Sequence, residues 1–559
     1  PIAPRPDDLP GQPADTTLPG YVAYTTGASW ATVAAAYADL VDRQIGKADL
    51  TAYVRDARKG LDPRRDREAI IGRLVARLGA DVKYTGIEFG DASIIPRTPA
   101  EVLERRYGDC KDKALLLAAL LRGAGVPAQL ALLDAGFGSD VDPDVPGLGG
   151  FDHAIVYVPG PKPLWIDATD QFSALGELPL GDQGRLALVA ARGTTALLQT
   201  PRAPSSANVS REDRTISVAE DGKVRVVEIS ELSGSAGHAM RSDYARAERK
   251  QIEERLTGYV RSTYKAKTLA RWQTSDFYDV ARPLRIELET ADAGIGTVTD
   301  ETVTVVLPLS ELFERLPDFL REPDGATHKR AAASAVRTLD YVYQDAHAHE
   351  LRYKIVAPHG FAPDPPPADE SISLGPARYS AGYRVERDGV VTATFRFDSG
   401  KPRFTPSELT AFLAAMKKVG ESRLPSLTFH QTGEAALAAG RVREALAEFR
   451  RLDGQHPHEA LHACQIARAY LEAGLGAAAR EEARRAVTLD PKSSRAQRTL
   501  GWVLESNLVG RRLKPGSDPK GAEAAYRKAL AVDPDDQVAR ASLAILLEHD
   551  ADGEHTFRP

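Results

Sequence analysis

One cysteine in this 559-residue sequence stands where nucleophilic chemistry would place it. Cys110 begins the apolar stretch CKDKALLLAALLRG, which predicts a helix over residues 110–123. A thiol at a helix N-terminus lies near the positive end of the helix dipole, which favours the nucleophilic thiolate. A lone cysteine is more often a small buried hydrophobe, so Cys110 is informative only together with suitable partners.

The partners that the sequence offers are His153 and Asp167. His153 begins the run HAIVYV, and Asp167 lies near the end of the next run, PLWIDAT. Two antiparallel strands joined by the turn PGPKP would bring these side chains alongside each other. An imidazole there can take the proton of a thiol, and a carboxylate can hold the imidazole in place. The order cysteine, histidine, aspartate is also that of papain-like enzymes.

The elements around these residues resemble a known family. The segment RYGDCKDKALLLAALLRGAGVPAQLALL, followed by FDHAIVYV and PLWIDATDQF, resembles the transglutaminase-like core of the papain-like cysteine superfamily. The resemblance covers roughly residues 30–200 and includes the upstream segment VKYTGIEFG. It implies Cys110 as the nucleophile, His153 as the general base and acid, and Asp167 as the orienting carboxylate. Proteins of this kind are commonly exported, which implies a periplasmic, secreted or cell-surface location in a bacterium.

Two departures from classical transglutaminases limit what this resemblance implies. Lys111 and Asp112 follow the cysteine where those enzymes carry an aromatic residue, and no calcium loop of the D-x-D-x-D-G type is present. We therefore expect neither a metal nor another cofactor. The backbone N–H of Cys110 is one expected oxyanion donor. Tyr84 is the best candidate for the second donor, although an aromatic at this position is more often a core or strand residue.

The remaining sequence divides by composition. Residues 1–28, rich in Pro, Asp and Gly, predict a tail or the remnant of a preceding domain, and the Pro1 start suggests a processed chain. Residues 29–200 form the predicted catalytic domain. Residues 207–420 contain strand patterns and a hairpin turn at Asp388-Gly389, which predict a β-sandwich-like domain with helical insertions.

Residues 426–549 show an internal repeat. Pro457 and Pro491 are 34 residues apart, and each lies at the end of a similar sequence segment. A third repeat unit follows, with an insertion around GRRLKPGSDPKG. Small residues recur at equivalent positions of the repeat units, namely at Gly433, Ala445, Ala467, Ala479, Gly501 and Ala522. By the same count, Phe429 also belongs to the first repeat unit. The pattern resembles tetratricopeptide repeats with a capping helix at 537–549, and an ordinary helical bundle is the alternative. The predicted fold class is thus multidomain α+β, with a papain-like transglutaminase core, a β-sandwich-like middle domain and an α-helical tetratricopeptide solenoid.

Composition excludes several classes of function. The net charge of −6 provides no basic field for nucleic acid, and no run approaches the ~18 apolar residues of a transmembrane helix. Two cysteines cannot build a disulfide framework or a multi-cysteine zinc site. His347 and His349 in DAHAHE predict a solvated helix end, with metal binding as the alternative.

These observations favour a thiol enzyme that transfers acyl groups from peptide or protein amides. Transfer to water would make it a peptidase or amidase, and transfer to an amine would make it a transamidase. The competing hypothesis is a non-catalytic scaffold with a vestigial transglutaminase-like fold. In either case we expect the repeats to bind a protein partner or to recruit a substrate.

Overall fold

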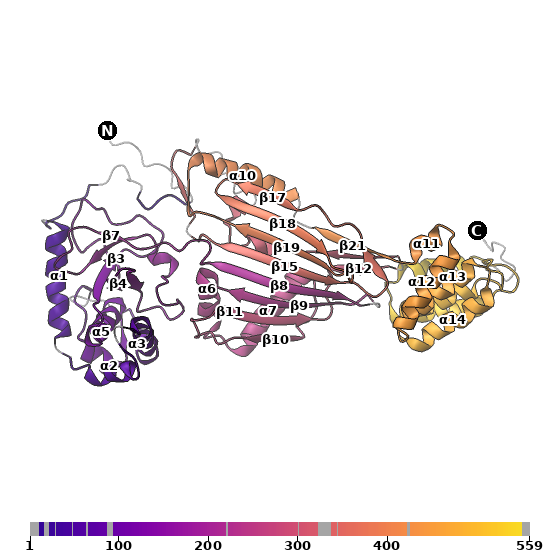
Figure 1. Cartoon of the computed structure of the whole chain (residues 1–559), viewed down its shortest axis with the longest axis horizontal. Helices are drawn as coiled ribbons and strands as arrows, with labels where there is room; N and C mark the ends of the chain where they lie inside the picture. The colour runs from indigo at the N-terminus through magenta and orange to yellow at the C-terminus, as the bar shows by residue number, and fades with distance from the viewer. Residues whose placement is uncertain are drawn as a thin grey trace.

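The computed structural model describes residues 11–15, 22–27, 29–46, 48–62, 65–86, 93–219, 222–299, 301–321, 337–343, 345–421 and 425–549. Within these residues the chain forms three successive parts, which follow one another along the long axis of the molecule (Figure 1). Most of the predicted tail 1–28 and residues 87–92 of the upstream segment lie outside the described residues.

The first part is an antiparallel five-stranded sheet with helices around one central helix, α5. Helices α1 to α4 and strands β3 and β4 contact α5, which is buried from Cys110 to Leu121. The sheet order is β5-β4-β3-β6-β7. The bounds are α1 (Trp30–Ile45), α2 (Thr51–Arg58), α3 (Arg67–Asp81), α4 (Pro99–Arg105), α5 (Cys110–Gly123), β3 (Gln129–Leu133), β4 (His153–Val158), β5 (Leu164–Ile166), β6 (Leu186–Val189) and β7 (Leu198–Gln199).

Helix α5 begins and ends where the sequence predicts. Asp109 is its N-cap and Asp112 closes a capping box with it, so both side chains satisfy backbone N–H groups of the first turn. Gly125, at φ +84°, lies just beyond the last turn, in a conformation that favours glycine. Two short strands, β1 (Lys83–Tyr84) and β2 (Tyr107–Gly108), pair in parallel just before the helix.

The middle part is built on an eight-stranded sheet of order β10-β11-β9-β8-β15-β19-β18-β17. Only β8 and β15 of these neighbours are parallel, and β18 and β19 form the hairpin predicted at Asp388-Gly389. The bounds are β8 (Val209–Val218), β9 (Val224–Leu232), β10 (Arg271–Thr274), β11 (Leu284–Thr290), β15 (Ala348–Val356), β17 (Glu370–Leu374), β18 (Ala377–Val385) and β19 (Val391–Asp398).

For this part the sequence predicts a β-sandwich-like domain with helical insertions, and helices and a second sheet share the core of the large sheet. Helices α7 (Arg249–Tyr264) and α10 (Pro406–Glu421) contribute buried side chains to the same hydrophobic core as the large sheet. A second sheet, of order β12-β13-β21-β16, also shares that core. Its strands are β12 (Gly296–Val298), β13 (Thr302–Val306), β16 (Phe361–Pro363) and β21 (Ser426–Gln431).

Strand β21 corrects the predicted start of the repeats at residue 426. Its buried residues Leu427, Phe429 and Gln431 alternate with more exposed ones, which is the period of a strand and not of a helix. Phe429 therefore belongs to the core of the middle part. The remaining short elements here are α6 (Gly234–Tyr244), α8 (Asp318–Arg321), β14 (Tyr341–Val342) and β20 (Arg403–Phe404).

Part of the predicted N-terminal tail packs on the middle part. Val342 N–H donates to the carbonyl of Gly11 at 2.7 Å, and Arg403 pairs with Asp15 at 2.9 Å. Residues 11–15 are thus fixed by backbone and charge contacts that a composition-based prediction does not reveal.

The third part is helical, and each helix contacts the next in sequence order. Ala445, Ala467, Ala479 and Ala522 are fully buried, as expected of small residues where helices approach closely. A Cβ on Gly501 would lie 2.7 Å from the Tyr526 ring, so the ring needs a glycine there. The helices are α11 (Glu434–Ala438), α12 (Val442–Gln455), α13 (Ala460–Glu472), α14 (Gly476–Leu489), α15 (Ser494–Leu504), α16 (Pro519–Val532) and α17 (Gln537–Leu547).

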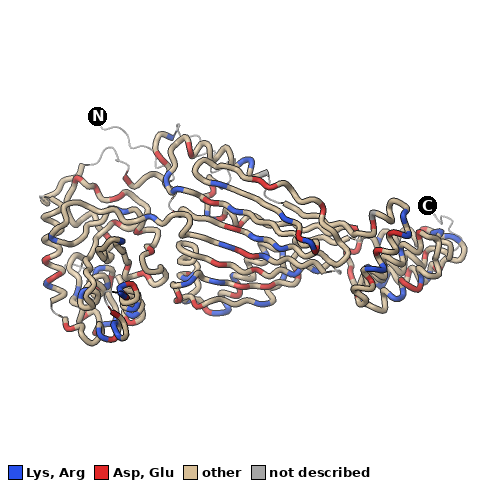
Figure 2. Tube along the Cα trace, viewed as in Figure 1, with Lys and Arg blue, Asp and Glu red and all other residues tan. Residues whose placement is uncertain are grey.

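Basic and acidic residues are interspersed along the strands of the large sheet (Figure 2). Cross-strand pairs such as Arg225 with Glu289 and Arg271 with Glu287 place opposite charges next to each other. None of the helices in the described part of the chain has the length and apolar character needed to cross a bilayer.

The inner face of the large sheet contains a buried charged cluster centred on Arg214. This guanidinium is wholly buried, pairs with Glu212, and lies 3.1 Å from Glu228. It also donates to the hydroxyl of Tyr259 at 2.9 Å, and Glu212 contacts His349 at 3.0 Å. Buried charges are tolerated only when they are paired, so the carboxylates depend on the single arginine.

We expect Arg214→Ala to lower the free energy of unfolding by about 3–5 kcal/mol, because it leaves Glu212 and Glu228 buried without their cation. Urea denaturation followed by far-UV circular dichroism measures this loss. Arg352→Ala is the control, because the Arg352 side chain is 45% exposed and its partner Glu350 keeps a second cation, Arg396, at 3.3 Å. That variant should lose no more than about 1 kcal/mol. Equal losses in the two variants would contradict a structural role for the buried cluster.

Candidate active site

The first turn of α5 holds Cys110 within a set of paired charges. Lys111 Nζ lies 2.6 Å from Asp109, and Arg97 lies 2.8 Å from Asp112. Asp109, Lys111 and Asp112 are all buried, and Cys110 itself is only 5% exposed. The residues that replace the aromatic of classical transglutaminases therefore stabilise the helix start, and their charges cancel in pairs.

Strands β4 and β5 bring His153 and Asp167 together as the sequence predicts. They are antiparallel neighbours with Val156 opposite Ile166. Continuing this register places Asp167 diagonally across from His153 on one face. His153 Nε2 lies 3.3 Å from Asp167 Oδ2.

Asp167 is held in place by hydrogen bonds of its own. Its Oδ1 accepts from the backbone N–H and the hydroxyl of Thr169, both at 2.8 Å. This leaves Oδ2 directed at His153.

His153 is also hydrogen-bonded to Cys110. Because Nε2 faces carboxylates, Nδ1 is the ring nitrogen that remains for the thiol. Burial lowers the pKa of His153, but the hydrogen bonds with Asp167 and Cys110 and the negative charge of Asp167 outweigh it and raise the pKa to about 11. The arrangement therefore favours an imidazolium, and a cation beside the thiol stabilises a thiolate.

Asp182 is a second carboxylate at this site, and the sequence reasoning missed it. Its Oδ2 lies 3.9 Å from His153 Nε2 and has no hydrogen-bond partner among the described residues. Burial and the charge of Asp167 raise the pKa of Asp182 to about 7, although His153 opposes the shift. Asp182 comes from a single 3₁₀ turn, Leu180–Asp182, held by the Gly136 N–H to Gly181 carbonyl bond of 2.8 Å. No spacing in the sequence signals that contact.

Lys113 adds one positive charge close to the carboxylates. It is fully buried, and its Nζ donates to the Val82 carbonyl at 2.9 Å. Burial lowers the pKa of Lys113 to about 8, while Asp167 opposes this shift. His153, Asp167 and Asp182 have the donor types and proximity to hold a metal ion, but the nearby ammonium of Lys113 disfavours a cation there.

The other candidate residues from the sequence are Tyr84, His347 and His349. Tyr84 lies in β1 and pairs with Gly108, a residue that is close in sequence to Cys110. Tyr84 is 51% exposed. The prediction of a solvated helix end at His347 and His349 is wrong, because both are buried at the start of β15. The face of the large sheet on which His349 lies is polar, and His349 is hydrogen-bonded to Glu212 there. The sequence of β15 therefore lacks the alternation of apolar and polar residues by which a strand is recognised.

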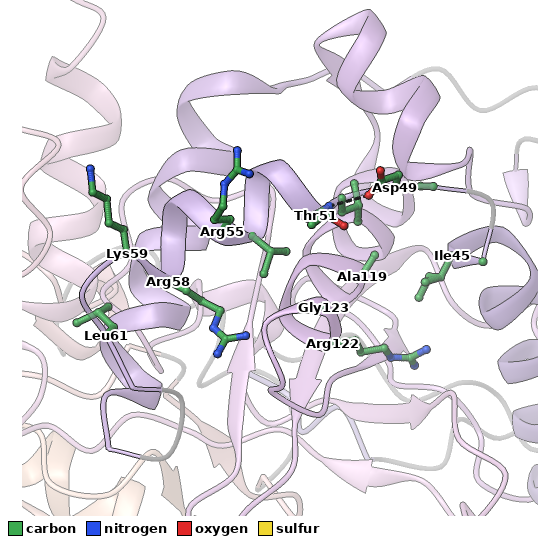
Figure 3. Close-up of a pocket in the computed structure, with 14 residues that line it drawn as sticks. Ile45, Asp49, Thr51, Arg55, Arg58, Lys59, Leu61, Ala119, Arg122 and Gly123 are labelled. Atoms are coloured by element: carbon green, nitrogen blue, oxygen red, sulfur yellow. Dashed lines mark hydrogen bonds between the residues drawn. The ribbon is translucent and has the colours of Figure 1, made fainter.

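A cavity of about 790 Å³ opens at the far end of α5 from Cys110 (Figure 3). Apolar residues of α2 and α5 line it together with the cationic side chains of Arg55, Arg58, Lys59 and Arg122. Arg122 is paired with Asp42 at 2.8 Å. At 1.5 Å per residue, most of the length of α5 separates this cavity from the thiol, so it is not part of the candidate active site.

The sequence comparison assigns one segment of the chain to a family. The profile of the transglutaminase-like superfamily matches residues 54–160, a segment that contains Cys110 and His153 and ends before Asp167. No curated protein matches the sequence.

Several solved structures are similar in part. A candidate protease from Parabacteroides distasonis ATCC 8503 aligns with a TM-score of 0.43 and 14% identity, covering 76% of this chain and 63% of that one. The present chain thus spans less than two thirds of that protein's length. The tetratricopeptide domains of Arabidopsis OM64 and Aspergillus fumigatus Sgt2 each align over 21% of this chain with 25% identity and TM-scores of 0.18, and 90% and 72% of those chains are covered. The family model thus matches residues 54–160, a segment in which α5 begins at Cys110.

Proposed function

We propose that the protein is a cysteine enzyme that transfers the acyl group of a peptide or protein amide. The observation that carries this proposal is that one imidazole, His153, contacts both the thiol of Cys110 and the carboxylate of Asp167. Nucleophilic cysteine catalysis requires this set of contacts. The match of residues 54–160 to the transglutaminase-like superfamily supports the same reaction class.

The proposed reaction proceeds in two steps. The Cys110 thiolate attacks the amide carbonyl carbon, and the C–N bond breaks as the His153 imidazolium gives its proton to the leaving amine. A thioester on Cys110 results. Water then attacks the thioester while His153 takes its proton, and the C–S bond breaks to release the carboxylic acid and to restore the Cys110 thiolate beside the His153 imidazolium. In transamidation an amine replaces water in this second step.

The developing negative charge on the carbonyl oxygen requires hydrogen-bond donors. The backbone N–H of Cys110, at the start of α5, is the proposed first donor. Tyr84, carried by the strand next to Gly108, is the proposed second donor. Asp167 orients His153 and does not take up the proton.

We further propose that the helical part is a tetratricopeptide-type solenoid that binds a peptide or protein partner. Its support is the period of 34 residues together with the buried small residues at the helix contacts. The partner could deliver the substrate to the first part of the chain.

Thiol labelling tests the proposed nucleophile. With limiting iodoacetamide at neutral pH, Cys110 should be alkylated and Cys464 should not, as measured by peptide mass spectrometry. Cys464 is the internal control, because the two thiols are 5% and 3% exposed, while Cys110 begins α5 and Cys464 lies in the middle of α13. His153→Ala should slow labelling of Cys110 about 10-fold or more, since the thiolate loses its counter-charge. Equal labelling of both cysteines, or no effect of His153→Ala, would favour the scaffold hypothesis.

Product analysis separates hydrolysis from transamidation. Incubation with an unfolded protein and a fluorescent primary amine should yield new peptide ends or ammonia from a hydrolase, and a fluorescent protein from a transamidase. Cys110→Ala should abolish either product. A product that persists in this variant would exclude Cys110 as the nucleophile.

The pH dependence of labelling tests Asp182. As Asp182 ionises near pH 7, a second negative charge appears beside His153 and stabilises the imidazolium and its thiolate partner. The labelling rate of Cys110 should therefore rise through about pH 7, and Asp182→Asn should remove this step. Asp388→Asn is the control, because Asp388 lies in the exposed turn between β18 and β19 and is not among the charges that act on Asp182. An unchanged profile in Asp182→Asn would contradict this role.

The pH dependence of the melting temperature is a second test of Asp182. The pKa of Asp182 is about 7 in the folded chain against 3.8 for its ordinary value, so the folded state binds the extra proton between these values. The stability that Asp182 contributes is therefore present below about pH 4 and is lost as pH rises to about 7. Asp182→Asn should match the wild type in melting temperature near pH 4 and exceed it above pH 7.

A further inference from the structure

Three histidines and one glutamate meet where the middle part joins the helical part. His359 lies in the turn that precedes β16. His456 follows the last turn of α12, Glu459 is the N-cap of α13, and His462 lies in the first turn of α13. The cluster is far along the chain from Cys110 and belongs to different parts of the molecule, so it is separate from the candidate active site.

The glutamate is the centre of this cluster. Glu459 Oε1 lies 2.8 Å from His359 Nδ1 and 3.8 Å from His456 Nδ1, and its Oε2 lies 3.1 Å from His462 Nε2. Although Glu459 is an N-cap residue, its side chain makes no capping hydrogen bond to α13. The carboxylate is directed at the imidazoles instead.

The position of His359 is fixed by the next residue. Gly360 has φ +84°, and a Cβ there would lie 2.8 Å from Leu452 Cδ1 of α12 and 3.4 Å from the His462 ring. Its carbonyl accepts from the Thr432 N–H at 2.7 Å. The turn that carries His359 is therefore held closely against the helical part, which only glycine permits at position 360.

The two partly exposed imidazoles are stacked. The ring centroids of His359 and His456 are 3.6 Å apart with an interplanar angle of 14°. One ligand atom each from His359, His456 and Glu459 can be chosen so that all lie within 4.8 Å of one another.

We propose that His359, His456 and Glu459 bind a divalent transition-metal ion of the zinc type, which links the middle part to the helical part. Imidazole nitrogen with carboxylate oxygen is a donor set suited to Zn²⁺, Ni²⁺ or Cu²⁺ and not to Ca²⁺ or Mg²⁺. His462, fully buried on the other carboxylate oxygen, orients Glu459 from outside the ligand set. Solvent supplies the fourth ligand on the side of His359, whose side chain is 58% exposed.

The geometry needs only a small adjustment to form this site. Zinc–ligand bonds of ~2.0–2.1 Å in a tetrahedron place the ligand atoms about 3.3 Å apart. The present separations are within 4.8 Å, and rotation about the side-chain bonds of partly exposed residues can close the difference. The proposal is independent of the proposed catalytic function.

Zinc titration of the full-length chain tests the site. The background variant is His153→Ala, so that the active-site cluster cannot contribute a ligand. Competition with a chromophoric chelator should show one Zn²⁺ bound per chain with micromolar or tighter affinity. His359→Ala and Glu459→Gln should each weaken binding about 10-fold or more.

Two histidines provide matched controls. His458 is exposed between the proposed ligands in sequence. His430 forms an exposed pair with Asp364 at 3.1 Å, which is not part of a three-donor group among the described residues. His458→Ala and His430→Ala should leave zinc affinity unchanged. Circular dichroism confirms folding, and zinc should raise the melting temperature of the background protein but not that of His359→Ala. Absence of binding up to about 100 μM zinc, or equal affinity in His359→Ala and His458→Ala, would overturn the proposal.

Discussion

The pairing of buried charges in the first turn of α5 is the interaction on which the candidate active site depends. Asp109, Lys111 and Asp112 are removed from water, which costs several kcal/mol per isolated ion unless each charge is paired. Lys111 pairs with Asp109, and Arg97 pairs with Asp112, while the two aspartates also cap the helix. The same side chains thus stabilise the helix start electrostatically and fix the backbone that presents Cys110.

The opposite side of the site is supported by the middle part. Asp170, close in sequence to Asp167, accepts from two backbone N–H groups of its own turn and lies 2.9 Å from His238 of α6. In the same loop Phe172 contacts the Tyr278 ring, with centroids 5.7 Å apart. The loop that carries the orienting carboxylate is therefore held between two parts of the chain. A change in how these parts sit together would move Asp167 before it moved Cys110, which is fixed within α5.

The features that the sequence predicted correctly are those set by local rules. A capping residue followed by a long apolar run defines α5, and two short apolar runs joined by a proline-containing turn define β4 and β5. These rules bring Cys110, His153 and Asp167 together without knowledge of the rest of the fold. Asp182 could not be found in this way, because a contact between two distant turns places it there.

The wrong predictions also concern residues whose environment is set by contacts between distant segments of the chain. Phe429 occupies a repeat phase by spacing, but its strand β21 pairs with β13 from more than a hundred residues earlier, and that tertiary pairing overrides the helical pattern. His347 and His349 look solvent-exposed by composition. Both histidines are buried. The buried face of the large sheet carries charged residues around Arg214, so the polarity of a residue does not predict its exposure in this part of the chain.

The two carboxylates beside His153 have different environments, and this difference assigns their roles. Asp167 receives two hydrogen bonds from Thr169 in addition to its contact with His153, whereas Asp182 Oδ2 has no such partner among the described residues. Two carboxylates in one low-dielectric site do not both ionise easily, and burial together with the charge of Asp167 raises the pKa of Asp182 to about 7. In the proposed mechanism, Asp167 therefore orients the imidazole of His153, whereas Asp182 adds a negative charge beside it only as the pH rises through about 7.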